Sequence, residues 1–214
     1  EIILTQGYHL GRLEVTQSQW LSVMPGWPSE QTPSGEYGAG DNYPAYYVSG
    51  SDAGDFIDAV NAHITATGQG SPNLRLPTEA EWENACRAGT TTRFYFGDSL
   101  SVEDQCEDDG LRSQYMWFCG NTDTTQPVGQ KLPNDFGLYD MHGNILEWCS
   151  NSMDWWNDGL LRGGTLVDPE GPPNGYDRLM RGGAWNQPAH RCRSAKRWYA
   201  AADSRENYYG FRVA

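Results

Sequence analysis

Hydrophobic residues recur at helical spacing in three stretches of the first half of the chain. In the first stretch, Thr16 and Gln19 form a capping-box pair ahead of Trp20, and Pro25-Gly26 ends the run. The second stretch, about residues 52–66, places its apolar side chains on one helical face. Both stretches are therefore predicted to be helices.

The third helix is predicted to begin at Thr78, which pairs with Glu81 in a second capping box, and to end at Gly89. Beyond it the periodicity fades, and residues from about 97 to 175 are predicted to be mostly loop. Loops of that length inside a folded domain need a function or a fastener.

Short runs of β-type residues return near the C-terminus. Strands are predicted over 178–185, 192–199 and 208–213. Helices followed by structured loops and a small antiparallel sheet predict an α+β fold. We find no internal repeat or low-complexity linker, so residues 1–214 are expected to form a single domain.

Composition adds that the fold is rich in loops and aromatic rings. The 214 residues include 9 Trp, 12 Tyr, 25 Gly and 12 Pro, a mixture in which large rings fix irregular segments. No apolar run approaches the roughly 20 residues that span a bilayer, so no membrane span is expected. The chain is expected to be a monomer.

The net charge of −13 excludes the partners that need a basic surface. Nucleic acid and anionic membranes bind through extended positive patches, and the sequence offers only a local Arg/Lys cluster within 181–197. In so acidic a chain, Arg193, Arg197 and Arg212 are expected to pair with buried or loop carboxylates.

The five cysteines do not specify a disulfide framework, because their number is odd, and no CxxC spacing indicates zinc. Cys106 and Cys119 are candidates for a bridge within the loop region. Cys149, next to Trp148, is expected to be an inert core thiol. No signal-peptide pattern is visible, which decides nothing because a leader is removed from a mature protein.

Long motifs give the chain a resemblance to a known family. "RLPTEAEWENACRAGTTTRFYFGD" (75–98), "PVGQKLPNDFGLYDMHGNILEWC" (127–149) and "RGGAW…CRSAKR…YYGFRVA" (181–214) resemble the formylglycine-generating enzyme, or sulfatase-modifying factor, family. "YHLGRLEVTQSQW" (8–20) resembles the opening strand and first helix of that family. The resemblance implies a C-type-lectin-like fold, with a small sheet carrying long irregular loops.

The resemblance also shows what the chain lacks. The oxidases of the family carry two copper-binding cysteines between the Gly-Gly pair and the following strand, where this chain has Asn186 and Gln187. Neutral amides supply no thiolate, so no copper is expected. Cys192 resembles a different cysteine of the family, which implies a disulfide with Cys86. The alternative for Cys192 is a buried thiol outside any bridge.

The segment "YDMHGNILEW" resembles the calcium loop of the family, although the family often has Asn where this chain has Asp140. The resemblance implies that the carboxylates of Asp140 and Glu147 and the carbonyls of Gly143 and Ile145 bind calcium, a hard cation that prefers oxygen ligands. The alternative is that Asp140 only accepts hydrogen bonds within its turn.

Residues 181–214 form a candidate variable, ligand-displaying segment. Its mixture of aromatic rings and short polar side chains is typical of recognition surfaces. It also resembles the variable proteins of diversity-generating retroelements, in which adenine-directed mutagenesis changes a C-terminal segment ending in a GFR motif. The candidate contacts are Trp185, Asn186, Gln187, His190, Trp198, Tyr199, Asp203, Ser204, Glu206, Asn207, Tyr208 and Tyr209.

Two classes of function remain open at this point. The first is a non-catalytic module that binds a protein or glycan ligand. The second is an enzyme of altered chemistry, such as an oxidase resembling the pyoverdine-maturation enzymes, with formylglycine generation as a weaker candidate because the thiol pair is missing. A disulfide and calcium would both suit an extracytoplasmic or particle-surface location.

Overall fold

The computed structural model describes residues 1–70, 73–98, 106–153, 164–172 and 177–214. The helices are α1 (Gln17–Val23), α2 (Gly50–Thr67), α3 (Glu79–Arg87), α4 (Arg112–Tyr115) and the 3-10 helix η2 (Ala189–Cys192). The strands are β1 (Ile2–Ile3), β2 (Leu146–Met153), β3 (Leu166–Val167), β4 (Asp177–Arg181), β5 (Trp198–Ala201) and β6 (Tyr209–Gly210). The predicted α+β class is confirmed.

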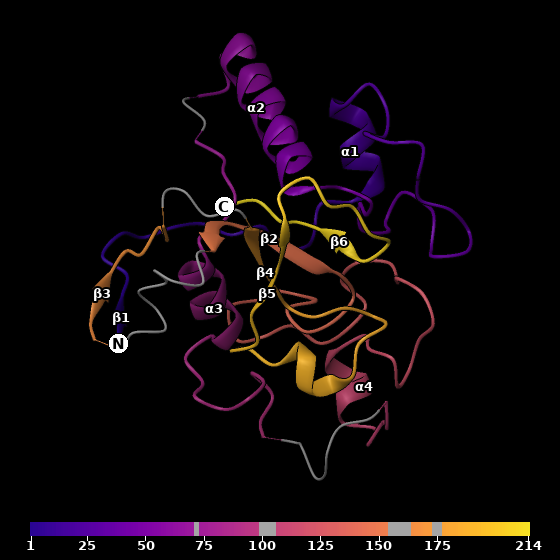
Figure 1. Cartoon of the computed structure of the whole chain (residues 1–214), viewed down its shortest axis with the longest axis vertical. Helices are drawn as coiled ribbons and strands as arrows, with labels where there is room; N and C mark the ends of the chain where they lie inside the picture. The colour runs from indigo at the N-terminus through magenta and orange to yellow at the C-terminus, as the bar shows by residue number, and fades with distance from the viewer. Residues whose placement is uncertain (71–72, 99–105, 154–163, 173–176) are drawn as a thin grey trace.

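A four-stranded sheet in the order β5-β4-β2-β6 forms the centre of the fold. β2 is antiparallel to β4, β4 is antiparallel to β5, and β6 runs parallel to β2. Figure 1 shows α1 and α2 toward one end of the molecule and α3 and α4 toward the other, with the sheet between them. β1 and β3 form a separate parallel pair at the side.

All three predicted helices are present, and their starts are fixed by side-chain caps. The capping boxes of Thr16 with Gln19 and of Thr78 with Glu81 form as predicted. α2 begins two residues earlier than predicted, because Ser49 and Asp52 form a third capping box. Each cap contributes about 1 kcal/mol to helix stability. No helix in the described part of the chain is long and apolar enough to cross a membrane.

The described residues between 97 and 175 are mostly loop, as predicted, but the prediction missed strand β2. Among the described residues, β2 is the longest strand; it lies inside the sheet, with both of its faces largely buried. Because a strand buried on both faces lacks polar alternation, its sequence gives no period-two signal.

The C-terminal strands are shorter than predicted. β4 ends at Arg181, four residues before the predicted end. Cys192 belongs to η2, so the predicted strand 192–199 is reduced to β5, which starts at Trp198. Only Tyr209 and Gly210 of the predicted strand 208–213 are paired in β6.

Aromatic rings join the helices to the sheet. Trp20 stacks on Phe56 of α2 at a centroid distance of 5.6 Å, and Phe56 meets Phe211 edge to face at 5.4 Å. Trp148 of β2 donates its indole N–H to the carbonyl of Val48 at 2.8 Å, so its polar atom is satisfied inside the core. The aromatic pairs Trp20–Phe56 and Phe56–Phe211 each stabilise the fold by about 0.5–1.5 kcal/mol beyond the effect of their buried area.

A buried ion pair joins strand β2 to the last residues of the chain. The guanidinium of Arg212 donates to both oxygens of Glu147 at 2.6 Å, and both side chains are fully buried. Trp82 of α3 donates its indole N–H to the same carboxylate at 2.7 Å. Arg212 also donates to the carbonyls of Gly11 and Tyr139, so one side chain joins four separate segments.

The expected pairing of the other two arginines is confirmed in one case. Arg197 forms a two-pronged ion pair with Glu79 at 2.7 and 2.9 Å. Arg193 instead donates its Nε–H to the backbone carbonyl of His190 at 2.7 Å.

The disulfide between Cys86 and Cys192 was predicted wrongly. Both are buried thiols outside any disulfide, and the ring of His142 lies beside them. Its Nδ1 is 2.7 Å from the carbonyl oxygen of Cys192, and its Nε2 is 3.9 Å from the sulfur of Cys86. The sulfur of Cys192 points instead toward the carbonyl oxygens of Ala184 and Pro188, each at 3.9 Å.

The other two cysteine predictions agree with the structure. Cys106 and Cys119 form a disulfide with a Cα–Cα distance of 5.0 Å. Cys149 is a buried thiol, and burial raises its pKa well above the ordinary value, as expected of an inert core residue.

Replacing Arg212→Met should destabilise the protein by about 3–5 kcal/mol, because Glu147 would remain as a buried charge without its partner. Urea unfolding measures this loss. The matched control is Arg87→Gln, whose partly exposed pair with Glu83 should cost at most about 1 kcal/mol. The double variant Glu147→Gln with Arg212→Met should be less destabilised than Arg212→Met alone. Equal losses for Arg212→Met and Arg87→Gln would contradict this account of the core.

Candidate ligand-binding face

Most of the predicted contact residues reach the surface. Asn186, Tyr199, Asp203 and Glu206 are exposed. The half-buried members are Trp185, His190, Trp198, Ser204, Asn207 and Tyr208. These ten residues come from the loop before η2, from η2 itself, from β5 and from the turn before β6. We call this set of ten residues the C-terminal face; within it, Trp198 and Tyr199 are consecutive in β5 and point to opposite sides of the sheet.

Two predicted contacts are buried and do not belong to this face. Tyr209 is 6% exposed, because it pairs with Leu146 in the sheet and packs edge to face on Trp148 at 5.5 Å. Gln187 is also 6% exposed, and its backbone carbonyl accepts a hydrogen bond from the amide of Cys119. Both residues are part of the scaffold rather than of its surface.

The turn that carries Asp203 is fastened to the start of α2. Arg205 donates two hydrogen bonds to the carboxylate of Asp52, both at 2.7 Å. Ser51 donates its hydroxyl to Asp203 at 2.7 Å and its amide to the carbonyl of Ala202 at 3.2 Å. Since Asp52 also caps α2, the same carboxylate fixes the helix and the turn.

A segment far away in the sequence extends the C-terminal face. The ring of Tyr37 lies 6.1 Å from that of Trp185, which also donates its indole N–H to the carbonyl of Asn207 at 3.5 Å. Tyr47 donates its amide to the carbonyl of Glu206 at 3.0 Å. A hydrogen bond to Glu36 raises the pKa of Tyr37.

The backbone at Tyr47 has a φ of 58°, in a region that large side chains avoid. Sequence reasoning missed Glu36, Tyr37 and Tyr47. Their signal, tyrosines near glycines, does not reveal which distant segment they meet.

No pair of thiols lies on the loop that follows Gly182-Gly183. The loop presents Asn186, whereas Cys192 is buried behind the glycines. A Cβ on Gly183 would come within 2.5 Å of the sulfur of Cys192, and Gly183 also has a φ of 78°. The glycine pair therefore serves the close approach of the scaffold to this thiol.

The predicted calcium ligands do not fit as a set. Both oxygens of Glu147 are bonded to Arg212, whose positive charge opposes a second cation there. Asp140 is buried, and one of its oxygens accepts the amide of Gly129 at 2.6 Å while the other makes no hydrogen bond to the protein. Burial raises the pKa of Asp140 to about 6. Calcium at Asp140 and the carbonyls of Gly143 and Ile145 stays a prediction.

Other metal sites find no support in the described residues, where no three His, Cys, Asp or Glu side chains are grouped to hold an ion.

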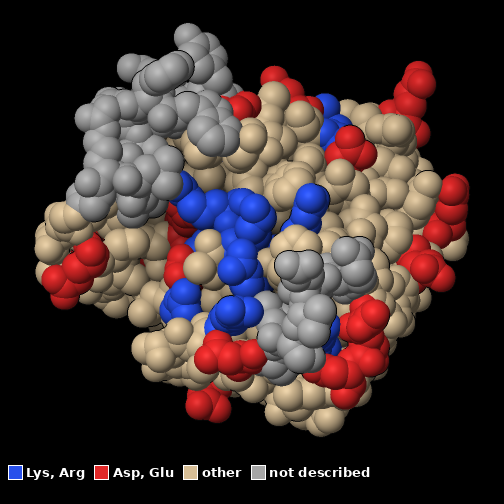
Figure 2. All heavy atoms as spheres, turned by 60° about the horizontal axis from the view of Figure 1, so that its bottom comes forward, with Lys and Arg blue, Asp and Glu red and all other residues tan. Residues whose placement is uncertain are grey.

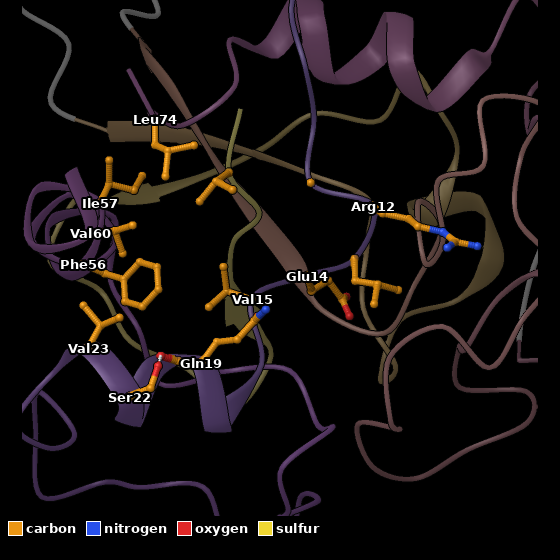
Figure 3. Close-up of a pocket in the computed structure, with 13 residues that line it drawn as sticks. Arg12, Glu14, Val15, Gln19, Ser22, Val23, Phe56, Ile57, Val60 and Leu74 are labelled. Atoms are coloured by element: carbon orange, nitrogen blue, oxygen red, sulfur yellow. Dashed lines mark hydrogen bonds between the residues drawn. The ribbon is translucent and has the colours of Figure 1, made fainter. Parts of the chain in front are cut away.

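An apolar cavity of about 420 Å³ lies elsewhere, between α1, α2 and the segment 11–15 (Figure 3). Phe56, Val60 and Val23 line it, and Figure 3 shows these side chains pointing toward one another. None of the residues of the C-terminal face lines this cavity. The two features are separate candidates for binding.

Comparisons with known proteins agree with the fold. The model of the family "Sulfatase-modifying factor enzyme 1-like domain" matches residues 1–214. The formylglycine-generating enzyme of Thermomonospora curvata is 31% identical over 212 residues, which cover 94% of this chain and 65% of that protein. This chain spans between half and two thirds of the length of the formylglycine-generating enzymes that it matches.

Two solved structures are similar over nearly the whole chain. Treponema denticola variable protein 1 has a TM-score of 0.76 and 27% identity, covering 95% of this chain and 82% of that one. PvdO from Pseudomonas aeruginosa has a TM-score of 0.74 and 25% identity, covering 95% and 78%. The predicted C-type-lectin-like, formylglycine-generating-enzyme-type fold is confirmed.

Replacing Asp52→Asn should loosen the turn at 202–206 and cost about 1–3 kcal/mol at neutral pH. Burial raises the pKa of Asp52, but hydrogen bonds from Arg205 and Ser49 outweigh it, so the net pKa lies below 3.8. The stabilisation is therefore present above that value and is lost as the pH falls through the folded pKa.

The measurements are urea unfolding at neutral pH and at about pH 3, where the difference from wild type should shrink, and hydrogen exchange of the turn. Asp55→Asn, on an exposed position of the same helix, is the control. Unchanged exchange at the turn in Asp52→Asn would refute the fastening.

Proposed function

This chain belongs to the sulfatase-modifying factor enzyme 1-like family, and we propose that it is a non-catalytic member that binds a ligand through its C-terminal face. The observation that carries the proposal is the loop after Gly182-Gly183. It presents Asn186 where the oxidases of the family carry thiols, and an amide supplies neither the copper ligand nor the nucleophile. The nearest thiol, Cys192, is turned into the core.

The residue types on the C-terminal face support a role in ligand binding. Rigid rings such as Trp185 and Tyr199 stand beside short polar groups such as Asn186 and Asp203, a combination that gives contact area and adaptable hydrogen bonds. The turn that carries Asp203 is already held by Arg205 and α2. A surface fixed before the ligand arrives loses less entropy on binding.

The similarity to Treponema denticola variable protein 1 supports a narrower version, in which the C-terminal face is diversified by a retroelement. In this version the mutable positions are exposed and the scaffold positions are buried. Tyr, Asp, Ser, His and Ala, which populate the segment, are all reached from an Asn codon by changing adenines.

The similarity to PvdO favours one alternative, an enzyme of altered chemistry. Such an enzyme would need a metal or cofactor site on the same frame. The two possibilities are separated by the metal that the purified chain retains and by its activity on a peptide.

The purified chain should hold less than stoichiometric copper and iron after loading with either metal, and it should not convert a cysteine-containing sulfatase peptide to formylglycine. Elemental analysis and mass spectrometry of the peptide measure the two results. The formylglycine-generating enzyme of Thermomonospora curvata serves as the positive control. Peptide turnover, or one copper or iron per chain, would overturn the non-catalytic assignment.

Sequencing of the gene's surroundings tests the retroelement version. A near-copy of the 3′ end of the gene should lie beside a reverse transcriptase gene and should differ from it at adenines. The differences should fall in codons for exposed positions such as 186, 199, 203 and 206, and should spare those for Gly183, Ser194 and Arg212. A neighbourhood without such a copy would remove this version while leaving ligand binding intact.

A further inference from the structure

Three cationic side chains lie together: Arg191 belongs to η2, and Arg193 and Lys196 follow it. Arg191 is exposed, and the other two are half-buried. Burial, and then the positive charges of Arg191 and Arg193, lower the pKa of Lys196, so these charges repel one another. Figure 2 shows that Lys and Arg side chains gather in the middle of one face, with acidic side chains around them. We call Arg191, Arg193 and Lys196 the cationic cluster.

The cationic cluster forms no ion pair with a carboxylate within the part of the chain that the structure describes, unlike most other arginines. Most other arginines of the chain are paired with carboxylates: Arg75, Arg87, Arg112, Arg181, Arg197, Arg205 and Arg212. Three neighbouring positive charges without a carboxylate partner among the described residues are unexpected in a chain with 28 acidic and 15 basic residues.

Two of these cations lie over one aromatic ring. The guanidinium carbon of Arg191 is 5.4 Å from the ring centroid of Trp198, and the amino nitrogen of Lys196 is 5.9 Å from it. Trp198 is half-buried at the start of β5, which is an edge strand of the sheet. The ring and the two charges thus form one surface that is partly apolar and partly cationic.

Hydrogen bonds hold the Arg193 side chain and the backbone of Lys196 in place. Arg193 donates one of its five N–H groups to the carbonyl of His190, and the carbonyl of Lys196 accepts a hydrogen bond from the buried Arg181 at 2.7 Å. The amide of Lys196 closes a turn on the carbonyl of Arg193 at 2.9 Å. The backbone of the cationic cluster is therefore fixed, whereas Arg191 extends into solvent.

We propose that the cationic cluster and Trp198 form a subsite for an anionic sugar, one that carries sulfate or carboxylate groups. Guanidinium groups bind these anions with paired, charge-assisted hydrogen bonds. The half-buried indole of Trp198 adds apolar surface beside these cations, on which the C–H groups of a sugar pack. This inference rests on the proposed function and names the ligand class for one part of the C-terminal face.

The size of the cationic cluster favours a glycan over a macromolecular partner with a broad footprint. A protein partner covers about 800 Å² on each side, so an acidic one would also meet the surrounding carboxylates. Nucleic acid needs a longer positive track. At physiological salt the screening length is about 8 Å, so a slender oligosaccharide senses the local cations more than the net charge of the chain.

The test is isothermal titration of the full chain with a heparin oligosaccharide, which carries sulfates and carboxylates. Desulfated heparin and polyglutamate serve as parallel probes. The variants are Arg191→Gln, Lys196→Gln and the two combined, with Arg12→Gln as the control because Arg12 is exposed and lies outside the cationic cluster. Urea unfolding of every variant confirms that the fold is intact.

Heparin should bind, and the double variant should bind at least about tenfold more weakly, since two charge-assisted contacts are lost. Arg12→Gln should bind like wild type. Retained binding of desulfated heparin assigns the contact to carboxylates, and its loss assigns it to sulfates.

The proposal is overturned if heparin does not bind, if Arg12→Gln weakens binding as much as the double variant, or if polyglutamate binds as tightly as heparin, which would indicate an acidic protein. None of these results bears on copper content or peptide turnover. Failure of the anionic-sugar subsite is therefore distinguishable from failure of the non-catalytic assignment.

Discussion

Arg212 and Glu147 form an ion pair that reaches no solvent, and the C-terminal part of the fold depends on it. Arg212 belongs to the last few residues of the chain, whereas Glu147 is in the middle of the sheet and receives Trp82 from α3. An ion pair in this position stabilises the fold only while both partners and their hydrogen bonds are present. The Arg212–Glu147 pair fixes the last few residues of the chain. The ion pair of Arg205 with Asp52 fixes the turn seven residues before Arg212.

From Ser194 to Phe211 the chain alternates scaffold and surface positions. Ser194, Tyr209 and Phe211 are buried, while Tyr199, Asp203 and Glu206 face solvent. Such a division allows the exposed side chains to change without a change in the fold, because surface substitutions away from special features alter stability little. It suits a family whose frame serves different tasks, since function belongs to the site rather than to the fold.

Sequence reasoning succeeded where the signal was local. Capping boxes such as that of Thr16 and Gln19 predicted the helices, because a cap is made within one turn. It failed for β2, whose burial on both faces comes from distant segments. Gln187 and Tyr209 were placed on the surface because burial, too, is decided by non-local packing.

Long motifs gave the family and the fold, but not the pairing of the cysteines. His142 lies beside Cys86 and the backbone of Cys192, an arrangement that no spacing in the sequence reveals. The contribution of Tyr37 to the C-terminal face was missed for the same reason.

The central claim is that the frame is independent of the side chains it displays. The most direct test is the urea unfolding of a variant in which Asn186, Tyr199 and Glu206 are all replaced by alanine. The account predicts one cooperative transition, with stability within about 2 kcal/mol of wild type, because each position is on the surface. Loss of the cooperative transition, or a much larger loss of stability, would show that these side chains hold the fold together and would contradict the account.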